Sequence, residues 1–150
     1  MSRTAVIEAI RAFNRYYTNI IGVVDRHILD SPFSLTEVRV LLEIYHDDGC
    51  NPRKIREILQ VNEGYLSRTI GKLAEQGLVD KRRSESDARM FALSLTDRGR
   101  RTFLSLNRKA GAAIDALIGS LTEQEVSELV GHMARIREIL GKRDRYEHSA

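Results

Sequence analysis

Apolar residues recur at three- and four-residue steps in long stretches near both ends of the chain. One stretch covers residues 4–29, and two more begin after Thr96 and after Thr122. This spacing places apolar side chains on one face of an α-helix. Three shorter stretches with the same period lie between them, at about residues 35–47, 52–60 and 63–76. The pattern predicts one long helix, three short helices and, after an interruption, two more long helices.

Residues that begin and end helices stand at the boundaries of these stretches. Segments 34–37 and 122–125 both have the form Ser/Thr-x-x-Glu, a capping box. Asn51 followed by Pro52 fits an N-cap and a first helical position, Asn62 fits another N-cap, and Gly77 fits a helix end.

Each short helix is expected to bury one apolar stripe. The stripes are Val38, Leu41, Leu42 and Tyr45 in the first, Ile55, Ile58 and Leu59 in the second, and Leu66, Ile70 and Leu73 in the third. The opposite face of the third then displays Glu63, Gly64, Tyr65, Ser67, Arg68 and Lys72.

The interruption that follows has the pattern of two β-strands. Residues 78–83 begin apolar and become cationic, residues 84–89 form a polar tip, and residues 91–95 alternate apolar and polar positions. A basic hairpin directly behind two short helices is typical of the winged helix-turn-helix. The expected fold is therefore mainly α with a small β-hairpin wing, and double-stranded DNA is the leading candidate partner.

Positive charge is concentrated around this hairpin. The net charge is only +3, but residues 51–101 hold 12 Lys and Arg against seven Asp and Glu. The surplus of five in this segment leaves a deficit of two elsewhere. Such a patch favours a nucleic-acid partner, although a solvated surface would have the same composition.

The outward face of the third short helix has the chemistry that reads base edges. Arginine bidentate to guanine is the commonest specific base contact, so Arg68 beside Ser67 is the expected reader. Gly64 allows the backbone to approach DNA closely. Tyr65 has two interpretations, a contact to a thymine methyl or phosphate, or packing against the preceding helix.

Other cations fit contacts to the DNA backbone. Arg53 and Lys54 begin a helix, where positive charge and free N–H groups together can clamp phosphates. Lys72 shares the outward face of the recognition helix, and Arg82 and Arg83 leave the hairpin core. We expect Arg53, Lys54, Arg82 and Arg83 to position the protein on DNA, and Lys72 to be a further DNA contact.

The tip of the hairpin carries Asp87 and Arg89, two residues apart and so on one side of an extended segment. We expect Asp87 to brace Arg89 while the guanidinium enters a narrow minor groove. The alternative is a plain surface ion pair, which contributes little.

Several other classes of protein are disfavoured. Cys50 is the only cysteine, so no intramolecular disulfide can form. No signal peptide is evident, and no apolar run approaches the roughly 20 residues of a membrane span, which indicates a cytoplasmic protein. The four histidines lack metal-ligand spacing and no phosphate-binding glycine loop is present, so we expect no catalysis, metal or cofactor.

The chain resembles the multiple-antibiotic-resistance regulator (MarR) family of transcription factors. The resemblance covers nearly the whole chain and is carried by segments 34–37, 66–68 with Leu73, 76–79, 87–89 and 95–99. Segments 13–18, 31–37 and 64–68 look most similar to a subgroup whose members often carry a GNAT-type acetyltransferase domain after the regulator domain. We expect no such second domain within these 150 residues.

The resemblance implies an obligate homodimer whose recognition helices enter successive major grooves of a pseudo-palindromic operator. It also implies repression that is relieved by a small ligand, often an aromatic acid or phenol. By position, the residues expected to line the ligand cleft are Asn14, Tyr17, Thr18, Ile21, Val38 and Leu42. Ordinary core packing is the competing interpretation for all six residues, and it is the favoured one for the aliphatic residues.

Two features depart from the family pattern. Ala88 stands where glycine or arginine is common between the wing Asp and Arg, so the tip geometry can differ. The redox-sensing branch uses a cysteine near the N-terminus, whereas Cys50 follows the first short helix. A peroxide-sensing role therefore does not carry over to Cys50.

The terminal helices have apolar stripes too long for a small central lobe to cover. A two-fold dimer of intertwined helices would bury them, and a monomeric bundle is the alternative. We expect one domain, with a winged helix at about residues 34–98 and dimerisation helices at about 4–30 and 99–141. A winged helix used for protein contacts, for instance as a regulatory module of an acetyltransferase system, remains the alternative function.

Overall fold

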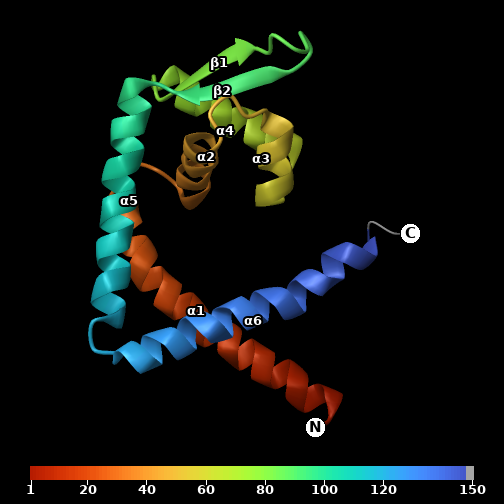
Figure 1. The fold of residues 1–150 in the computed structure, drawn as a ribbon, viewed down its shortest axis with the longest axis vertical. Helices are drawn as coiled ribbons and strands as arrows, with labels where there is room; N and C mark the ends of the chain where they lie inside the picture. Colours follow the sequence, from red (N-terminus) through yellow and green to blue (C-terminus); the bar gives the residue numbers. More distant parts are fainter. Residues whose placement is uncertain (148–150) are drawn as a thin grey trace. The chain divides into compact units, whose positions relative to one another are not determined.

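The computed structural model describes the backbone of residues 1–147, and the side chains there except at positions 21, 23–29 and 142–147. Figure 1 shows the order of the elements. They are α1 (Arg3–Leu29), α2 (Leu35–His46), α3 (Pro52–Leu59), α4 (Glu63–Glu75), β1 (Val79–Arg83), β2 (Phe91–Leu95), α5 (Asp97–Ile118) and α6 (Glu123–Glu147). The predicted order and the mainly α fold class with a hairpin wing are confirmed.

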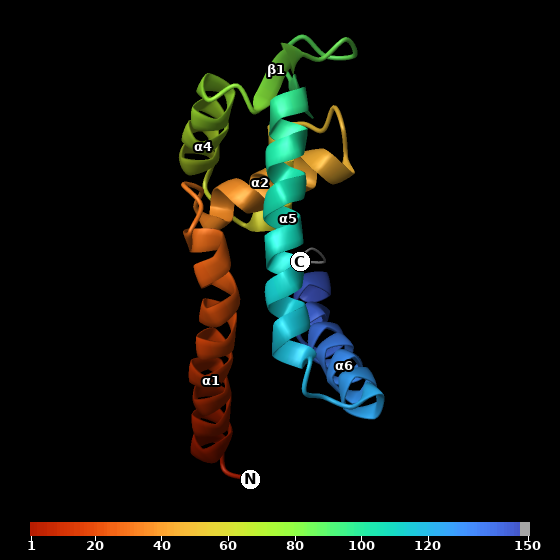
Figure 2. The same cartoon turned by 90° about the vertical axis from the view of Figure 1, so that its left-hand side faces the viewer.

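The chain divides into two compact units, Met1–Ala113 and Ile114–Ala150. The first unit holds the winged helix and its core. In that core α2 packs against α3, α4 and β2, and both cartoon views draw α2 and α4 close to the hairpin (Figures 1 and 2). The ring centroids of Tyr45 on α2 and Phe103 on α5 are 4.7 Å apart, and aromatic packing of this kind stabilises the helix pair.

The buried face of α2 differs from the predicted one. Glu37, Val40, Leu41 and Ile44 are buried, whereas Val38, Leu42 and Tyr45 are only half-buried. The helix is thus rotated by about one residue from the prediction. The difference arises because an acidic residue, Glu37, occupies the inner face of the helix. A prediction from the spacing of apolar residues alone places a carboxylate on the solvent-facing side.

Helix α3 buries a narrower stripe than predicted. Ile55 and Leu59 are buried, but Ile58 is 46% exposed. A two-turn helix presents one i, i+4 stripe to its neighbours, so the intervening residue faces away. The prediction for α4 is confirmed, since Leu66, Ile70 and Leu73 are buried and its outward residues are exposed.

The wing is an antiparallel pair whose register runs from Val79 opposite Leu95 to Arg83 opposite Phe91. The loop after α2 extends this sheet. Leu93 N donates to Cys50 O at 2.9 Å, and Gly49 N donates to Leu93 O at 2.8 Å. Cys50 is therefore buried at the edge of the wing sheet, and burial together with nearby Asp47 raises the pKa of its thiol to about 11.

The start of α5 is locked to the turn after α4. Thr96 caps the long helix that was predicted to begin after it, because its Oγ1 accepts from Gly99 N at 2.9 Å. The same hydroxyl donates to Gly77 O at 2.6 Å, and Thr96 N donates to Leu78 O at 3.1 Å. Gly99 lies so close to Leu78 that a Cβ added at Gly99 would stand 1.9 Å from Leu78 O.

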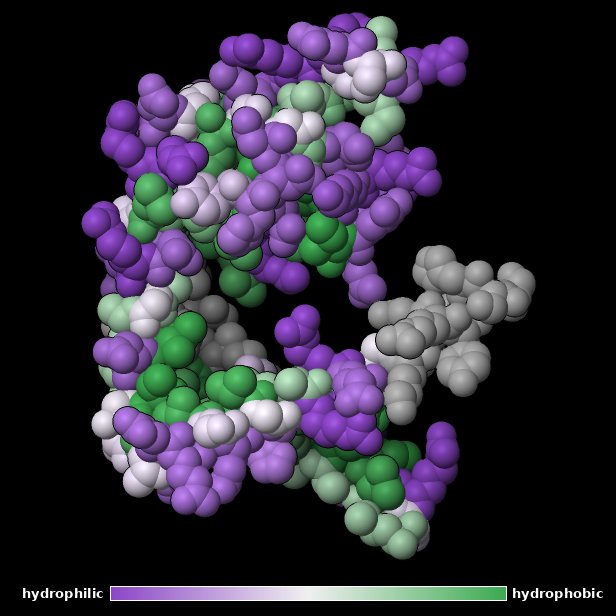
Figure 3. All heavy atoms as spheres, in the orientation of Figure 1, coloured by the Kyte–Doolittle hydropathy of each residue, from purple (hydrophilic) through white to green (hydrophobic). Residues whose placement is uncertain are grey.

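The long helices expose many apolar side chains. On α1 these include Val6, Ile7, Ile10 and Phe13, and on α6 they include Val130, Ile136, Ile139 and Leu140. The face drawn in Figure 3 is mostly hydrophilic over the hairpin and shows hydrophobic residues gathered on long helices. In the described part of the chain, no helix is both long and apolar enough to cross a membrane.

Candidate nucleic-acid interface

Helix α4 presents the predicted recognition face. The side chain of Asn62 caps it by accepting from Tyr65 N at 2.7 Å. Gly64, Tyr65, Ser67 and Arg68 are all exposed. Tyr65 is 41% exposed, so part of its surface faces solvent and more than half of it is covered by the protein.

The guanidinium of Arg68 lies over the first turn of α4. Its Nη1 is 3.5 Å from the point that a Cβ on Gly64 would occupy. Among the residues that the structure describes, Arg68 has no carboxylate partner. The glycine thus leaves room for an unpaired cation at the start of the recognition helix, where the helix dipole also favours an anionic ligand.

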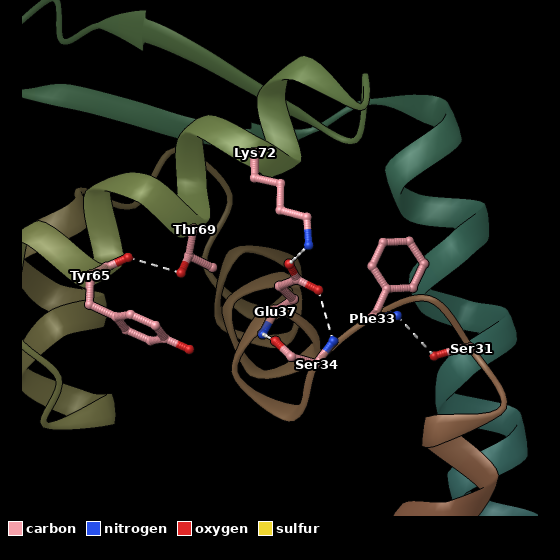
Figure 4. A network of polar contacts seen from close by, with 7 residues as sticks. All are labelled: Ser31, Phe33, Ser34, Glu37, Tyr65, Thr69 and Lys72. Carbon is pink, nitrogen blue, oxygen red and sulfur yellow. Dashed lines mark hydrogen bonds and ion pairs between the residues drawn. The ribbon is translucent and has the colours of Figure 1, made fainter.

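Lys72, one turn beyond Arg68, is placed differently from the prediction. Its Nζ lies 2.6 Å from Oε1 of Glu37, which is buried on α2 (Figure 4). Burial alone would raise the pKa of Glu37, but hydrogen bonds from Lys72 and Ser34 and the Lys72 charge together hold it below its usual value. The ammonium is therefore committed to a contact inside the protein.

The start of α3 carries its two cations in exposed ion pairs. Arg53 Nε lies 3.2 Å from Glu57 Oε1, and Lys54 Nζ lies 2.6 Å from Asp47 Oδ2. The hydrogen bond to Asp47 and its charge raise the pKa of Lys54. Exposed pairs are weak, so a phosphate can displace the carboxylates.

One of the backbone N–H groups that were expected to be free at the start of α3 already has a hydrogen-bond partner. Asn51 Oδ1 accepts from Lys54 N at 2.9 Å. An N-cap side chain uses the N–H that would otherwise point to solvent. A phosphate at this helix end would therefore be held mainly by side chains.

The wing is stiffened by its own side chains. Arg83 Nη1 donates to the carbonyl of Ala88 at 2.9 Å, across the tip. Lys81 Nζ lies 4.1 Å from the centroid of the Phe91 ring, a cation–π contact. Arg82 is exposed and pairs with Asp80 only at 3.7 Å. Of the two predicted phosphate contacts, Arg82 is free to move, whereas Arg83 also shapes the loop.

The predicted brace between Asp87 and the guanidinium of Arg89 is wrong. Asp87 Oδ1 accepts from the backbone N of Arg89 at 3.0 Å, and Met90 N donates to Asp87 O at 3.0 Å. A short acidic side chain in a tight turn hydrogen-bonds the backbone two residues on. Asp87 thus fixes the turn, and the Arg89 guanidinium has no carboxylate partner in the described residues.

A groove of about 380 Å³ lies between helices α3 and α4 and the wing. It is lined by four cations, Arg53, Arg56, Lys81 and Arg89, and by one carboxylate, Glu63. Arg56 and Glu63 face each other at 3.5 Å. A strand of phosphates running from a major groove into the adjacent minor groove would meet this surplus of positive charge.

Sequence reasoning missed two of these groove cations, Arg56 and Lys81. Lys81 stands in the cationic run of residues 81–83, which was a usable indication. No feature of the sequence indicated Arg56, because its position near the wing depends on how α3 packs against β2.

The residues predicted to line a ligand cleft are not enclosed by one chain. Asn14, Tyr17 and Thr18 are exposed on α1, and Val38 and Leu42 are half-buried on α2. Leu42 packs against the core of the winged helix. The side chain of Ile21 lies outside the described residues.

The chain is similar to known proteins across this lobe. A family model described as MarR family matches residues 31–90. Over 81 residues the chain is 35% identical to the HTH-type transcriptional regulator BilQ of Clostridium symbiosum, covering 54% of this chain and 56% of that protein. The chain spans 56%, 63% and 65% of the length of three curated relatives that it matches, all named as HTH-type transcriptional regulators.

Solved structures show the same fold. A mutant MarR from E. coli in complex with operator DNA superposes with a TM-score of 0.74 at 20% identity, covering 88% of this chain and 95% of that one. FabT of Streptococcus pneumoniae in complex with DNA superposes with a TM-score of 0.75 at 20% identity, covering 89% and 98%. These superpositions show that this chain has the same fold as both proteins.

Proposed function

We propose that the protein is a sequence-specific DNA-binding regulator of transcription. The observation that carries this proposal is the joint exposure of two arginines, Arg68 on α4 and Arg89 on the wing, near a cationic groove that is lined by α3, α4 and the wing. Neither arginine has a carboxylate partner among the described residues. One reader for a major groove and one for the adjacent minor groove together allow a protein to recognise a duplex. Relatives named as transcriptional regulators support the same function.

The roles within this interface divide by position. Arg68, Ser67 and the backbone at Gly64 meet base edges, and Tyr65 contacts a thymine methyl or a phosphate. Arg89 enters the minor groove from the turn that Asp87 shapes. Phosphates are held by Arg53, Lys54, Arg56, Lys81, Arg82 and Arg83.

The active form is a homodimer. Apolar side chains at Val6, Ile7, Ile10 and Phe13 remain exposed on α1, and α6 exposes a further set. Exposed apolar surface of this extent marks an interaction site, and a two-fold partner would cover it and place two recognition helices on a pseudo-palindrome. Light scattering of the purified protein should give twice the mass of one chain, and a monomeric mass would contradict this.

The regulator is a repressor released by a small aromatic or phenolic ligand. Support comes from the family pattern and from the polar side chains Asn14, Tyr17 and Thr18, exposed on the same helix as the apolar surface. A second protomer would convert this exposed face into an enclosed cleft. Benzoate and phenol derivatives should lower the affinity for operator DNA, and a panel without effect would contradict the ligand assignment.

Fluorescence anisotropy with duplex DNA from upstream of the protein's own gene tests the main proposal. A dimer that holds at least four phosphates should show a slope of log affinity against log salt of about −3.6. The affinity should then fall about a hundredfold between 50 and 200 mM salt. A flat response, or no binding, would contradict DNA recognition.

A protein-contact module of an acetyltransferase system is the alternative function. The relatives above are named as transcriptional regulators. Their names do not support this alternative, and they do not support the expected similarity to GNAT-type fusion proteins. A regulator must reach the chromosome, so the proposed function goes together with the predicted cytoplasmic location. It also goes with the predicted division into a winged helix at 34–98 and flanking dimerisation helices.

A further inference from the structure

The carboxylate of Glu37 serves two elements at once. Its Oε2 accepts from Ser34 N at 2.8 Å, and Ser34 Oγ accepts from Glu37 N at 3.2 Å, which completes the capping box of α2. Its Oε1 accepts from Lys72 Nζ on α4 at 2.6 Å. Figure 4 shows Lys72 reaching from α4 down to this carboxylate. The cap of one helix is therefore the anchor of another.

The anchor is rigid on its α2 side. Glu37 is only 5% exposed, and the capping box fixes both its backbone and its side chain. The ammonium of Lys72 thus meets an oxygen whose position the core has already set. Because the pair joins residues 35 apart in sequence, it constrains how α4 lies on α2 and adds nothing within either helix.

The anchored point lies close to the base-reading face. Lys72 follows Arg68 by four residues, so both side chains project from the same face of α4. Ser67 lies on the adjacent exposed surface. A rotation of α4 that moved Lys72 away from Glu37 would also turn Arg68 and Ser67 relative to a DNA groove.

A direct phosphate contact by Lys72 would be costly. If the ammonium turned to DNA, it would leave a buried carboxylate without its counter-ion, and an uncompensated buried charge destabilises strongly. Exposed pairs such as Arg53 with Glu57 carry no such penalty. The two kinds of cation on this surface therefore have different roles.

We propose that Glu37 and Lys72 form a positioning pair that sets the orientation of α4 on α2, and thereby aims Arg68 and Ser67 at base edges. The inference rests on the proposed function, in that α4 is taken to be the recognition helix. In this proposal Lys72 does not contact a phosphate. It contributes to DNA recognition by fixing the positions of Arg68 and Ser67.

Three variants and a control test the pair. Glu37→Gln keeps the capping box, because glutamine also serves at that position, but removes the charge. Lys72→Met removes the ammonium and keeps the aliphatic stem, and the double variant removes both. Lys109→Met is the matched control, since Lys109 is an exposed lysine on α5 outside the winged helix.

Affinity, salt slope and base preference are measured at a temperature where circular dichroism shows every variant folded. Each single variant should lose about five- to tenfold in affinity for operator DNA. A loss of this size is in the range of coupling energies between residues in contact. The salt slope should be unchanged, discrimination against base-substituted operators should fall, and the double variant should be no worse than either single one. Lys109→Met should match the wild type.

A phosphate contact by Lys72 gives the opposite results, and they would overturn the proposal. Lys72→Met would then reduce the salt slope by about 1 and weaken all sequences equally. Glu37→Gln would raise the affinity, because it frees a cation. Unchanged affinity in both single variants would equally overturn it.

Hydrogen exchange without DNA separates this inference from the proposed function. The amides of α4 should exchange several-fold faster in Glu37→Gln and in Lys72→Met than in the wild type or in Lys109→Met. If the wild type binds no duplex, the proposed function fails while the exchange rates still decide whether the pair holds α4. Equal exchange rates in all four proteins would show that it does not.

Discussion

Replacing Gly99 by alanine tests how closely α5 is docked on the wing. The added Cβ would stand 1.9 Å from Leu78 O and 2.8 Å from Leu78 C, both backbone atoms. Real Cβ contacts do not fall below 3.0 Å, so the start of α5 must move by about 1 Å relative to Leu78. Rotation of a side chain cannot relieve the clash, because the backbone of Leu78 is held by its neighbours.

The movement breaks a defined set of contacts. The bond from Thr96 N to Leu78 O, now 3.1 Å, would pass beyond hydrogen-bonding distance, and the 2.6 Å bond from Thr96 Oγ1 to Gly77 O would be strained. Each such bond contributes about 1 kcal/mol, and overpacking costs about 1–3 kcal/mol more. Alanine returns about 1 kcal/mol in helix propensity. The expected net loss in free energy of unfolding is about 2–4 kcal/mol.

Urea unfolding followed by circular dichroism measures this loss. With a slope near 2 kcal/mol/M, the midpoint of Gly99→Ala should fall by about 1–2 M. Protomer concentration must be held constant, because dimerisation couples it to stability. Gly111→Ala is the matched control on the same helix, where an added Cβ meets nothing within 4 Å. The control should be unchanged or up to about 1 kcal/mol more stable, and equal midpoints for the two variants would refute the reasoning.

Three further predictions follow from the site. Arg68→Ala should remove about 1–3 kcal/mol of discrimination at one base pair, whereas Arg53→Ala should weaken binding to all duplexes alike; identical preference profiles in a base-substitution series would contradict this division. Because the pKa of Cys50 is about 11, its thiol should stay protonated at pH 7.5 and react with iodoacetamide far more slowly in the folded protein than in urea, and equal rates would count against its burial. The folded pKa of Glu37 lies below its usual value of 4.5, so its contribution to stability is present above that value and is lost as the pH falls through the lower folded pKa. Between pH 5 and 3, Glu37→Gln should therefore lose less stability than the wild type, and parallel curves would contradict the depressed pKa.

The elements of the fold could be predicted because their causes are local. Apolar period, the capping box at Ser34, the caps at Asn51 and Asn62, and alternation in residues 91–95 each act within a few residues. The same local logic identified the exposed face of α4, because a helix has one apolar stripe and its opposite face must meet solvent.

The pairing of charges could not be predicted in the same way. Asp87 was expected to hold the guanidinium of Arg89 but holds its backbone N–H. Lys72 was expected to reach DNA but meets Glu37, and Arg56 joined the groove without any sequence indication. A side chain with several partners in reach chooses among them by position and burial, and these depend on how the helices pack.

By itself, then, the sequence determined the order of helices and strands, the helix caps, and the surface on which positive charge gathers. Tertiary structure alone decided the rotation of α2, the burial of Glu37 and Cys50, and which cations remain free for a ligand. The physical reason is the distance along the sequence over which each interaction acts. Hydrogen bonds and periodic burial within one helix or hairpin are set by neighbours in sequence, whereas the contacts of Glu37 with Lys72 and of Cys50 with Leu93 exist only once distant segments have packed together.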